Sequence, residues 1–269
     1  MRESEIFPPE KVHPSVSDLR SEKILQESVT FDPVKRKYVL DIPWRLGREK
    51  TAEIFSDMDF YNMALNRQHK LKQKFLKNPE LVSGSFAQVR ETLSLGHSRV
   101  LDTLAVQPGV PVCYLPNLVV LHPDKPGKFR VCQDAAAQVK GKSLNSFLWA
   151  GPDLMNNLVG ILTRCRRGRY VVTADIKNFF YQIMLNPKDA PALRYFWWSN
   201  EEMTEIIVIE GSVHLFGIAS SPTVATFVCR HHFATLTDIP EWIKDVVRKS
   251  FYVDDLMHSF DTESEGREL

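Results

Sequence analysis

The sequence predicts an α+β fold in which an antiparallel sheet carries helices on one face. Two short runs rich in apolar and aromatic residues, 251–253 and 256–260, flank Asp254 and Asp255 and are typical of a β-hairpin. The apolar run 170–176 is typical of a buried strand. Between residues 60 and 75 the apolar residues recur instead at helical spacing. The chain therefore combines both classes of element.

Bulk composition indicates an ordinary globular protein. The 269 residues are enough for one large or two ordinary domains, and 43% apolar with 25% charged residues is typical of a chain that buries a core. The net charge of +1 does not by itself predict a nucleic-acid partner. The four cysteines are scattered, which argues against a disulfide framework and favours a reducing intracellular setting. No signal peptide is expected, nor any apolar run near the ~20 residues of a membrane span.

The first half of the chain predicts a β-hairpin followed by two helices. Residues 1–28 are polar and proline-containing, which predicts poor order. Residues 31–44 are typical of a strand, a turn and a returning strand. A helix over 60–75 and a second one opening at Asn78 and Pro79 form the expected helical hairpin, with Gly96 ending it. Packing is the favoured role of this hairpin, and template contact is the alternative.

The second half predicts further strands and helices around the run at 170–176. After a loop at 102–117, residues 118–121 and 128–132 are expected to form two strands joined by a turn. A helix is expected to open at Gly151 and Pro152, and its last turn is rich in arginine. Strands are expected at 192–198 and 206–216, then helices at 223–235 and 239–249.

Three carboxylates suggest a metal site. Asp254 and Asp255 are expected at the tip of the hairpin, and Asp175 at the end of its strand. Carboxylate oxygens suit Mg²⁺, and two such ions can clamp the attacking and leaving oxygens of a phosphoryl transfer. The alternatives are a solvated Asp-Asp turn and, for Asp175, a helix N-cap. Basic residues dominate positions 125–169, where nine basic side chains face two acidic ones, a pattern typical of phosphate contact or of a solvated surface.

Several motifs resemble those of reverse transcriptases. The family's Tyr-x-Asp-Asp motif is matched at 252–255, its first palm motif at 173–183, and the motif between these two at 216–222, in the family's order. Further stretches, at 114–117, 122–128, 142–145 and 151–154, are similar to the BEL/Pao type of LTR retrotransposon. The resemblance is specific from about Tyr114 to Phe260, and weaker from about Phe31 to Leu101.

The resemblance implies a right-hand polymerase palm with fingers, and template-directed transfer of dNTPs to a primer by two Mg²⁺ ions, with Mn²⁺ as the alternative. It makes Asp175 and Asp254 the main metal ligands, Asp255 the supporting one, and the backbone of Ile176 a further ligand. The nucleotide would be bound by Lys125, Lys128 and Arg130, by the backbone of Asn178 and Phe179, and by Phe180 as a gate against the ribose 2′-hydroxyl. For Phe180 the alternative is a core aromatic. The expected nucleic-acid contacts are Phe216, Gly217, Ser221, Pro222, Tyr252, Arg164, Arg166 and Arg167.

The resemblance also divides the chain. Residues 1–100 would form an α-helical N-terminal extension with the β-hairpin and the helical hairpin, and 101–269 the fingers and palm, ending after the Asp-Asp hairpin. The thumb is expected to be missing, and protease, ribonuclease H and integrase domains are expected in a longer polyprotein. The partners would be an RNA or DNA primer–template and dNTPs, and no membrane. The expected location is the cytoplasm, a virus-like particle or the nucleus.

Three function classes stay open from the sequence. The first is a polymerase fragment with a competent metal site. The second is a degenerate or domesticated product that binds nucleic acid or protein without catalysis. The third is another two-metal nucleotidyl-transfer enzyme with a palm. The basic stretch favours the first two, and the intact carboxylates favour the first over the second.

Overall fold

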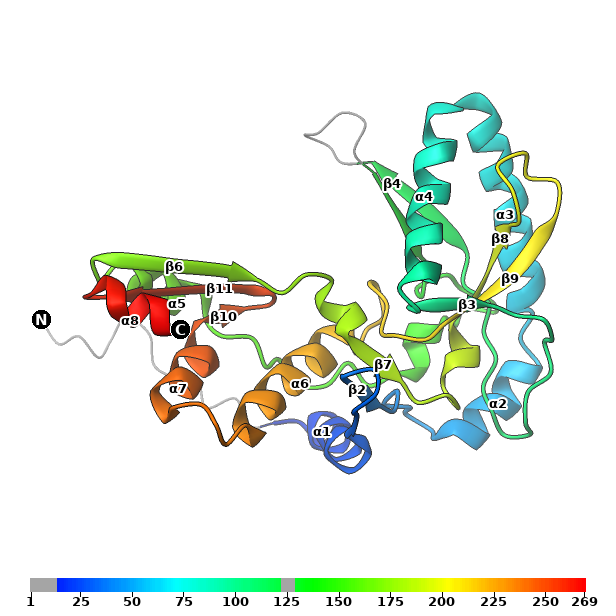
Figure 1. Ribbon diagram of the computed structural model, residues 1–269. Helices are drawn as coiled ribbons and strands as arrows, with labels where there is room; N and C mark the ends of the chain where they lie inside the picture. Colours follow the sequence, from blue (N-terminus) through cyan, green and yellow to red (C-terminus); the bar gives the residue numbers. More distant parts are fainter. Residues whose placement is uncertain (1–13, 122–128) are drawn as a thin grey trace, which may run out of the picture.

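The computed structural model describes residues 14–121 and 129–269 (Figure 1). Lys125 and Lys128, predicted to contact the triphosphate, lie outside the described residues. The α+β class is confirmed, but the single antiparallel sheet was wrong. The described strands form four small sheets, and one of them contains a parallel pair. Short strands joined by irregular segments cannot extend one continuous ladder, so each sheet covers only part of the core.

The elements run in the following order. The helices are α1 Val16–Ser28, α2 Arg48–Ser56, α3 Phe60–Lys77, α4 Glu80–Ser94, α5 Leu158–Cys165, α6 Ser221–Thr235, α7 Glu241–Ser250 and α8 Glu263–Glu268. The strands are β1 Thr30–Asp32, β2 Lys37–Leu40, β3 Ser98–Val100, β4 Asn117–Leu121, β5 Phe129–Gln133, β6 Tyr170–Asp175, β7 Ile183–Leu185, β8 Arg194–Trp198, β9 Ile206–Gly211, β10 Phe251–Tyr252 and β11 Asp255–Phe260. Three 3₁₀ turns are η1 Leu144–Phe147, η2 Phe179–Gln182 and η3 Ala190–Leu193.

The sheet of β6, β10 and β11 projects from the rest of the molecule as an arm (Figure 1). Its strands are antiparallel, with β11 in the middle, and α5, α7 and α8 all contact β11. Leu256 and Phe260 are buried, and the Phe260 ring meets Trp242 of α7 edge-on. Most of β6, including Asp175 at its end, is exposed. The predicted hairpin of residues 251–260 is therefore confirmed, with an open strand beside it.

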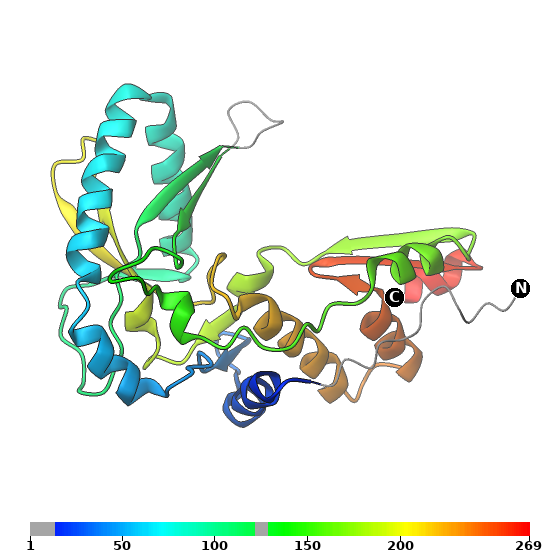
Figure 2. The ribbon, with the colours of Figure 1, turned by 180° about the vertical axis from the view of Figure 1, so that it is seen from behind.

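The helical hairpin and two small sheets form the opposite end of the molecule (Figures 1 and 2). Helices α3 and α4 contact each other, and they pack on β4, β5 and β8 as the apolar stripe predicts. Phe75, Phe86 and Trp197 are at most 3% exposed and lie in one cluster beneath the helices. Packing is thus the role that the structure gives the inner faces of these helices.

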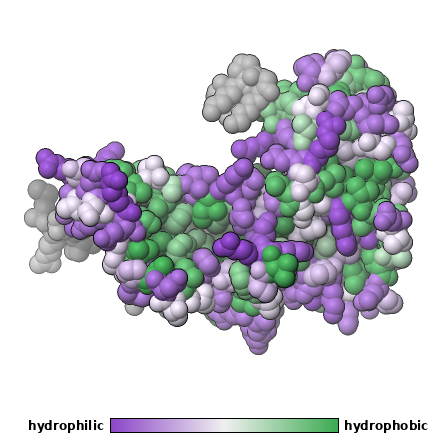
Figure 3. Space-filling model, viewed as in Figure 1, coloured by the Kyte–Doolittle hydropathy of each residue, from purple (hydrophilic) through white to green (hydrophobic). Residues whose placement is uncertain are grey.

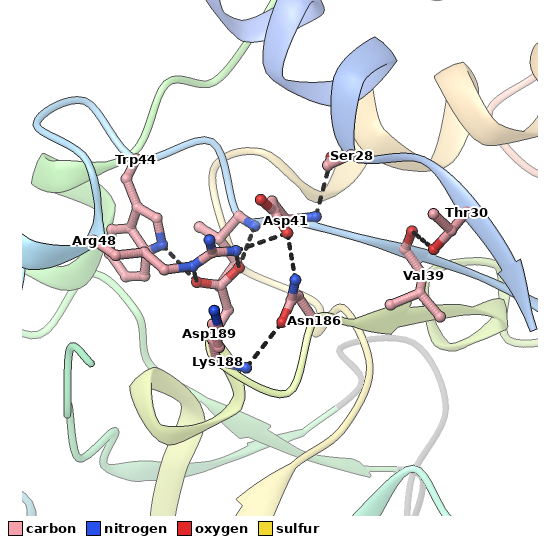
Figure 4. Close-up of polar contacts among 10 residues, drawn as sticks. Ser28, Thr30, Val39, Asp41, Trp44, Arg48, Asn186, Lys188 and Asp189 are labelled. Atoms are coloured by element: carbon pink, nitrogen blue, oxygen red, sulfur yellow. Dashed lines mark hydrogen bonds and ion pairs between the residues drawn. The ribbon is translucent and has the colours of Figure 1, made fainter. Parts of the chain in front are cut away.

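A second region joins the early part of the chain to its middle. Strand β2 pairs in parallel with β7, and a buried carboxylate, Asp189, accepts hydrogen bonds from Ile42, Trp44 and Arg48 (Figure 4). The Arg48 guanidinium holds both Asp189 and Asp41, and these hydrogen bonds raise its pKa. Both oxygens of the Asp189 carboxylate accept hydrogen bonds. Such a carboxylate can be buried without a large desolvation penalty.

Two predicted boundaries were wrong. Residues 16–28 form helix α1, because Ser15 and Asp18 build a capping box at its start. The helix expected to open at Gly151 begins only at Leu158, where the Asn157 side chain accepts from the Gly160 N–H at 2.9 Å. The residues before it are not helical, and hydrogen bonds from α6 to the Pro152 and Leu154 carbonyls hold them against their helical pattern.

Candidate functional site

Two of the predicted carboxylates lie directly opposite each other. Asp175 ends β6 and Asp255 begins β11, and the two are register partners in the antiparallel ladder. Partner side chains point to the same face, with Cβ atoms about 4.5–5.5 Å apart. Both residues are exposed, so their carboxylates are open to solvent and to a ligand.

Asp254 lies in the tight turn between β10 and β11. Tyr252 pairs with Asp255, so the two turn residues are Val253 and Asp254, not the Asp-Asp pair that the sequence predicted. The turn needs a positive φ, and Val253 adopts it at 57°, which strains a β-branched residue by on the order of 1–3 kcal/mol. The Asp254 carbonyl accepts from the Ile176 N–H at 3.0 Å and fixes the turn to the end of β6.

The acidic groups offer the donors that a hard cation prefers. Asp175 and Asp255 supply carboxylate oxygens from adjacent strands, and Asp254 precedes Asp255 on the same hairpin. Mg²⁺ is commonly bound by one or two carboxylates together with substrate phosphates. Within residues 14–121 and 129–269, no three acidic, histidine or cysteine side chains are gathered closely enough to hold a metal alone. Asp175, Asp254 and Asp255 are therefore the residues that could hold a cation here.

A cleft of about 490 Å³ opens beside these carboxylates. Asp175 and Asp254 line it, together with Arg130 of β5 and the aromatic residues Phe180 and Phe216. The surface is hollowed between the arm and the body that carries α3 and α4 (Figure 3). The fold therefore brings acidic, basic and aromatic side chains from distant segments to one cleft.

The aromatic wall is built by two short irregular segments. The rings of Phe180 and Phe216 meet with their centroids 5.7 Å apart. Asn178 adopts a left-handed backbone (φ 55°), which asparagine tolerates, and turns the chain from β6 into η2. Phe179 is 7% exposed and its ring lies in the core, so only its backbone is available to a ligand. Phe216 is 57% exposed and forms the outer edge of the wall.

Further polar residues line the cleft, and sequence reasoning assigned them no role. His97 lies there, with its ring centroid 5.1 Å from that of Tyr181, and its Nδ1 is buried without a partner among the described residues. Burial, and then the nearby Lys37 charge, lower the pKa of His97. Burial raises the pKa of Tyr181 and of the Cys132 thiol. No motif marks His97 or Cys132 as a cleft residue, because they reach the cleft through tertiary packing, whereas Tyr181 lies within the motif at 173–183 but received no role.

The predicted nucleic-acid contacts are not all on the surface. Ser221 is buried and its hydroxyl donates to the Leu215 carbonyl at 2.8 Å, so its side chain supports the loop of residues 216–220. Gly217 in this loop has a φ of 92°, while Pro222 is exposed and Tyr252 is half-buried. The loop thus presents Phe216 rather than the serine.

The arginine cluster lies at the far end of β6 from Asp175. Arg164 donates to the Lys249 carbonyl and is partly buried, whereas Arg166 and Arg167 are exposed. The strand separating them from Asp175 spans six residues, roughly 20 Å at about 3.3 Å per residue. The exposed arginines are therefore at a distance from the cleft that only an extended ligand could bridge.

Comparison with known proteins finds partial structural similarity to solved structures only. No protein-family model matches the chain, and no curated protein matches it. Three solved structures of foamy viral protease-reverse transcriptases are similar. A complex with double-stranded DNA is 20% identical over 68% of this chain and 28% of its own (TM-score 0.49). A complex with an RNA/DNA hybrid is 20% identical over 66% and 19% (TM-score 0.45). The native prototype foamy virus protein is 18% identical over 71% and 21% (TM-score 0.48).

The likeness to these foamy viral proteins is partial, with identities of 18–20% and TM-scores below 0.5. The chain spans less than a third of the length of these foamy viral proteins. Membership of the BEL/Pao type stays a prediction, as does the division of the chain at residue 100. None of the helices in the described part of the chain combines the length and apolarity needed to span a bilayer.

Proposed function

We propose that this chain is the fingers-and-palm part of a reverse transcriptase-like polymerase. It would join the 3′-hydroxyl of a primer to the α-phosphate of a dNTP, with release of pyrophosphate. The observation that carries the proposal is the pairing of Asp175 with Asp255 beside Asp254, at the mouth of a cleft lined by Arg130 and Phe180. Acidic groups beside a basic and an aromatic group suit a metal–nucleotide complex better than any neutral ligand.

The acidic residues have the role of metal ligands in this proposal. Asp175 and Asp254 line the cleft and would hold the ions, with Asp255 supporting from the adjacent strand and the Ile176 backbone as a further oxygen donor. These carboxylates would hold Mg²⁺, which would supply charge stabilisation at the phosphate and acidify the primer hydroxyl. The strained turn at Val253 fixes where Asp254 stands before any ligand arrives.

The remaining cleft residues would bind and orient the nucleotide. The planar Arg130 guanidinium can stack on a base and donate to phosphate oxygens at once, which lysine cannot do. The backbone N–H groups of Asn178 and Phe179 would face the phosphates. Phe180, braced by Phe216, would lie under the sugar. The exposed Arg166 and Arg167 would follow the primer–template backbone away from the cleft.

Metal binding tests the proposal without requiring turnover. The melting temperature should rise with millimolar Mg²⁺ or Mn²⁺, because the ions bind the folded site and not the unfolded chain. Asp254→Asn should abolish most of this rise, since an amide cannot supply the charge. Asp238→Asn is the matched control, because Asp238 is exposed and outside the cleft. Primer extension by the wild type then tests the chemistry, and absence of both effects contradicts the proposal.

One observation favours a second candidate, a chain that binds nucleic acid without catalysis. No three candidate ligand side chains are gathered together within the described residues. In that case the exposed arginines would still bind a polynucleotide, but divalent ions would leave the melting temperature unchanged. The same pair of measurements, metal-dependent melting and nucleic-acid binding, separates the two candidates.

A further inference from the structure

Residues 145–157, here called the connector, run from η1 to α5 along the side of helix α6 (Figure 2). We propose that the connector positions both halves of the cleft: Asn145 fixes the Phe216 loop (residues 216–220), and Asn156 fixes the base of the carboxylate hairpin. This rests on the proposed function, since it assigns one half to the nucleotide and the other to the metal. Neither asparagine touches the cleft, so both would be positioning residues.

Asn145 holds the Phe216 loop through both ends of its amide. Its Nδ2 donates to the Gly217 carbonyl at 3.0 Å, and its Oδ1 accepts from the Ala219 N–H at 2.9 Å. Residues 216–219 belong to no strand or helix, and Ser220 is tied to α6 by its carbonyl, which accepts from the Val224 N–H. The two Asn145 bonds therefore fix the outer part of the loop. They hold Gly217 in its left-handed conformation and leave Phe216 directed at Phe180.

Asn156 holds the base of the carboxylate hairpin, and only its amide nitrogen is used. Its Nδ2 donates twice, to the Arg248 carbonyl at 3.0 Å and to the Phe251 carbonyl at 2.9 Å. Arg248 is in the last turn of α7 and Phe251 is the first residue of β10. This single amide thus fixes the joint from which the hairpin with Asp254 and Asp255 extends.

The segment between the two asparagines is itself fixed to α6. Thr223 donates its hydroxyl to the Pro152 carbonyl at 3.0 Å, and Arg230 donates to the Leu154 carbonyl at 2.6 Å. Gly151 has a φ of 82°, and a Cβ there would meet the Thr223 methyl at 2.7 Å, so only glycine fits this approach. A connector held along one rigid helix fixes the position of one asparagine relative to the other.

We expect the same substitution to have different effects at Asn145 and Asn156, because the two amides make different hydrogen bonds. Asn145→Asp keeps the acceptor for the Ala219 N–H, loses the bond to Gly217 and sets one carboxylate oxygen against the Gly217 carbonyl. Asn156→Asp loses both bonds, because it can donate neither, and sets a negative charge against two carbonyls. Asn145→Ala and Asn156→Ala remove every side-chain bond at their sites. Asn200→Ala is the matched control, because the side chain of this asparagine bonds only Thr204, outside the cleft.

Hydrogen exchange of the full chain measures the positioning directly. Asn145→Ala should speed exchange in residues 216–221 by roughly tenfold or more, and leave residues 249–256 unchanged, because about two hydrogen bonds are removed. Asn156→Ala should do the reverse. Asn145→Asp should have a smaller effect than Asn145→Ala, and Asn156→Asp an effect at least as large as Asn156→Ala.

Ligand affinities test whether the positioning serves the site. Mn²⁺ binding, measured by electron paramagnetic resonance, should weaken in Asn156→Ala and not in Asn145→Ala. Binding of dATP at saturating Mn²⁺, measured by calorimetry, should weaken in Asn145→Ala and much less in Asn156→Ala. A role in stability alone would lower both affinities together, or neither, and so would overturn the proposal, as would equal exchange at both loops. If the wild type binds neither ligand, the proposed function fails, and the exchange data decide the positioning by themselves.

Discussion

Phe180 shows what one side chain in the cleft can control. Its ring lines the cleft near Asp175 and is braced by Phe216, at a centroid distance of 5.7 Å. A ring held from one side cannot easily move away from a sugar bound on the other. In the proposed polymerase this rigidity would exclude the additional hydroxyl of an rNTP by steric clash.

Replacing this ring should therefore change the choice of sugar. We expect Phe180→Val to raise rNTP incorporation relative to dNTP by tenfold or more, about 1.4 kcal/mol, with a modest loss of dNTP use. Primer extension with separate dNTP and rNTP pools measures it. Phe227→Val, an aromatic truncation on α6 outside the cleft, is the control. An unchanged preference in Phe180→Val would make Phe180 an ordinary packing residue.

His214 is a buried side chain with no hydrogen-bond partner at either ring nitrogen within the described residues. Burial lowers its pKa from 6.5 to about 4. Between these values the unfolded chain binds a proton that the folded chain does not, so stability falls as the pH is lowered from 6.5 toward 4. Above pH 6.5 the histidine is neutral in both the folded and the unfolded chain. The stability that acidification removes, a few kcal/mol, is then fully present.

An apolar replacement should remove this acid sensitivity. We expect His214→Leu to be more stable than the wild type by about 1–3 kcal/mol, and the gain to be larger at pH 5 than at pH 8. Urea unfolding at the two pH values measures it. His231→Leu, at a half-buried position of α6, is the control. A gain that does not depend on pH would show that His214 is not the group that titrates.

At the scale of elements, the turn from α5 to β6 concentrates positive charge. Arg166, Arg167 and Arg169 are exposed there, whereas Arg164 is engaged with the Lys249 carbonyl. Cations at a helix C-terminus are favourable in themselves, which is the simplest reason for their presence. Their position about one strand length from Asp175 also suits contact with a duplex that leaves the cleft.

Salt dependence separates these two explanations. Reversing the three exposed charges, Arg166, Arg167 and Arg169, to Glu should weaken primer–template binding. The log–log salt slope should become shallower by about 0.9 for each phosphate that the variant no longer neutralises. Reversing Arg20 and Lys23, exposed on α1, should leave the slope unchanged. An unaltered slope in the triple variant would assign the cluster to the helix end alone.

The elements that local pattern could predict are those with a strong period or strong caps. The stripe at 60–75 became α3, and the two apolar runs around the carboxylates became β10 and β11. The exact turn could not be predicted, because Val253 takes a positive φ that its type disfavours and only the register with β6 requires. The late start of α5 was equally hidden, since bonds from Thr223 and Arg230 hold the preceding residues.

In the candidate site, too, local patterns predicted some residues, and tertiary contacts determined the others. The motifs identified Asp175, Asp254 and Phe180, because these residues occur in fixed local patterns. They did not identify His97, which reaches the cleft from a separate segment, and they gave no role to Tyr181 beside Phe180. The buried state of Ser221 was also hidden, because its partner, the Leu215 carbonyl, is defined by the loop's conformation.

At the scale of the whole molecule, Asp189 joins the early and middle parts of the chain (Figure 4). Its carboxylate is fully buried and receives the Ile42 N–H at 2.8 Å, the Trp44 indole at 2.8 Å and the Arg48 guanidinium at 2.7 Å. Beside it, β2 pairs with β7. Because η2 leads directly into β7, the position of the cleft residues on η2 thus depends on residues far earlier in the chain.

Removing this charge should unfold the joint rather than weaken one contact. We expect Asp189→Asn to lower the free energy of unfolding by about 3–5 kcal/mol, because Arg48 is left partly buried with half its partners. Urea unfolding followed by circular dichroism measures the loss. Asp238→Asn, at an exposed position, should be neutral within about 0.5 kcal/mol. A small loss for Asp189→Asn would mean that Asp41 alone satisfies Arg48.

The contacts around Asp189 can form only late in the synthesis of the chain. Trp44 is synthesised 145 residues before the carboxylate that receives its indole N–H. At about 5–20 residues per second, the ribosome needs on the order of ten seconds to add the intervening stretch. Throughout that interval β2 has no partner on its β7 side, and the Arg48 guanidinium has only Asp41. The nascent protein must therefore keep an unpaired strand and an apolar indole from misassociating until the acidic residue emerges.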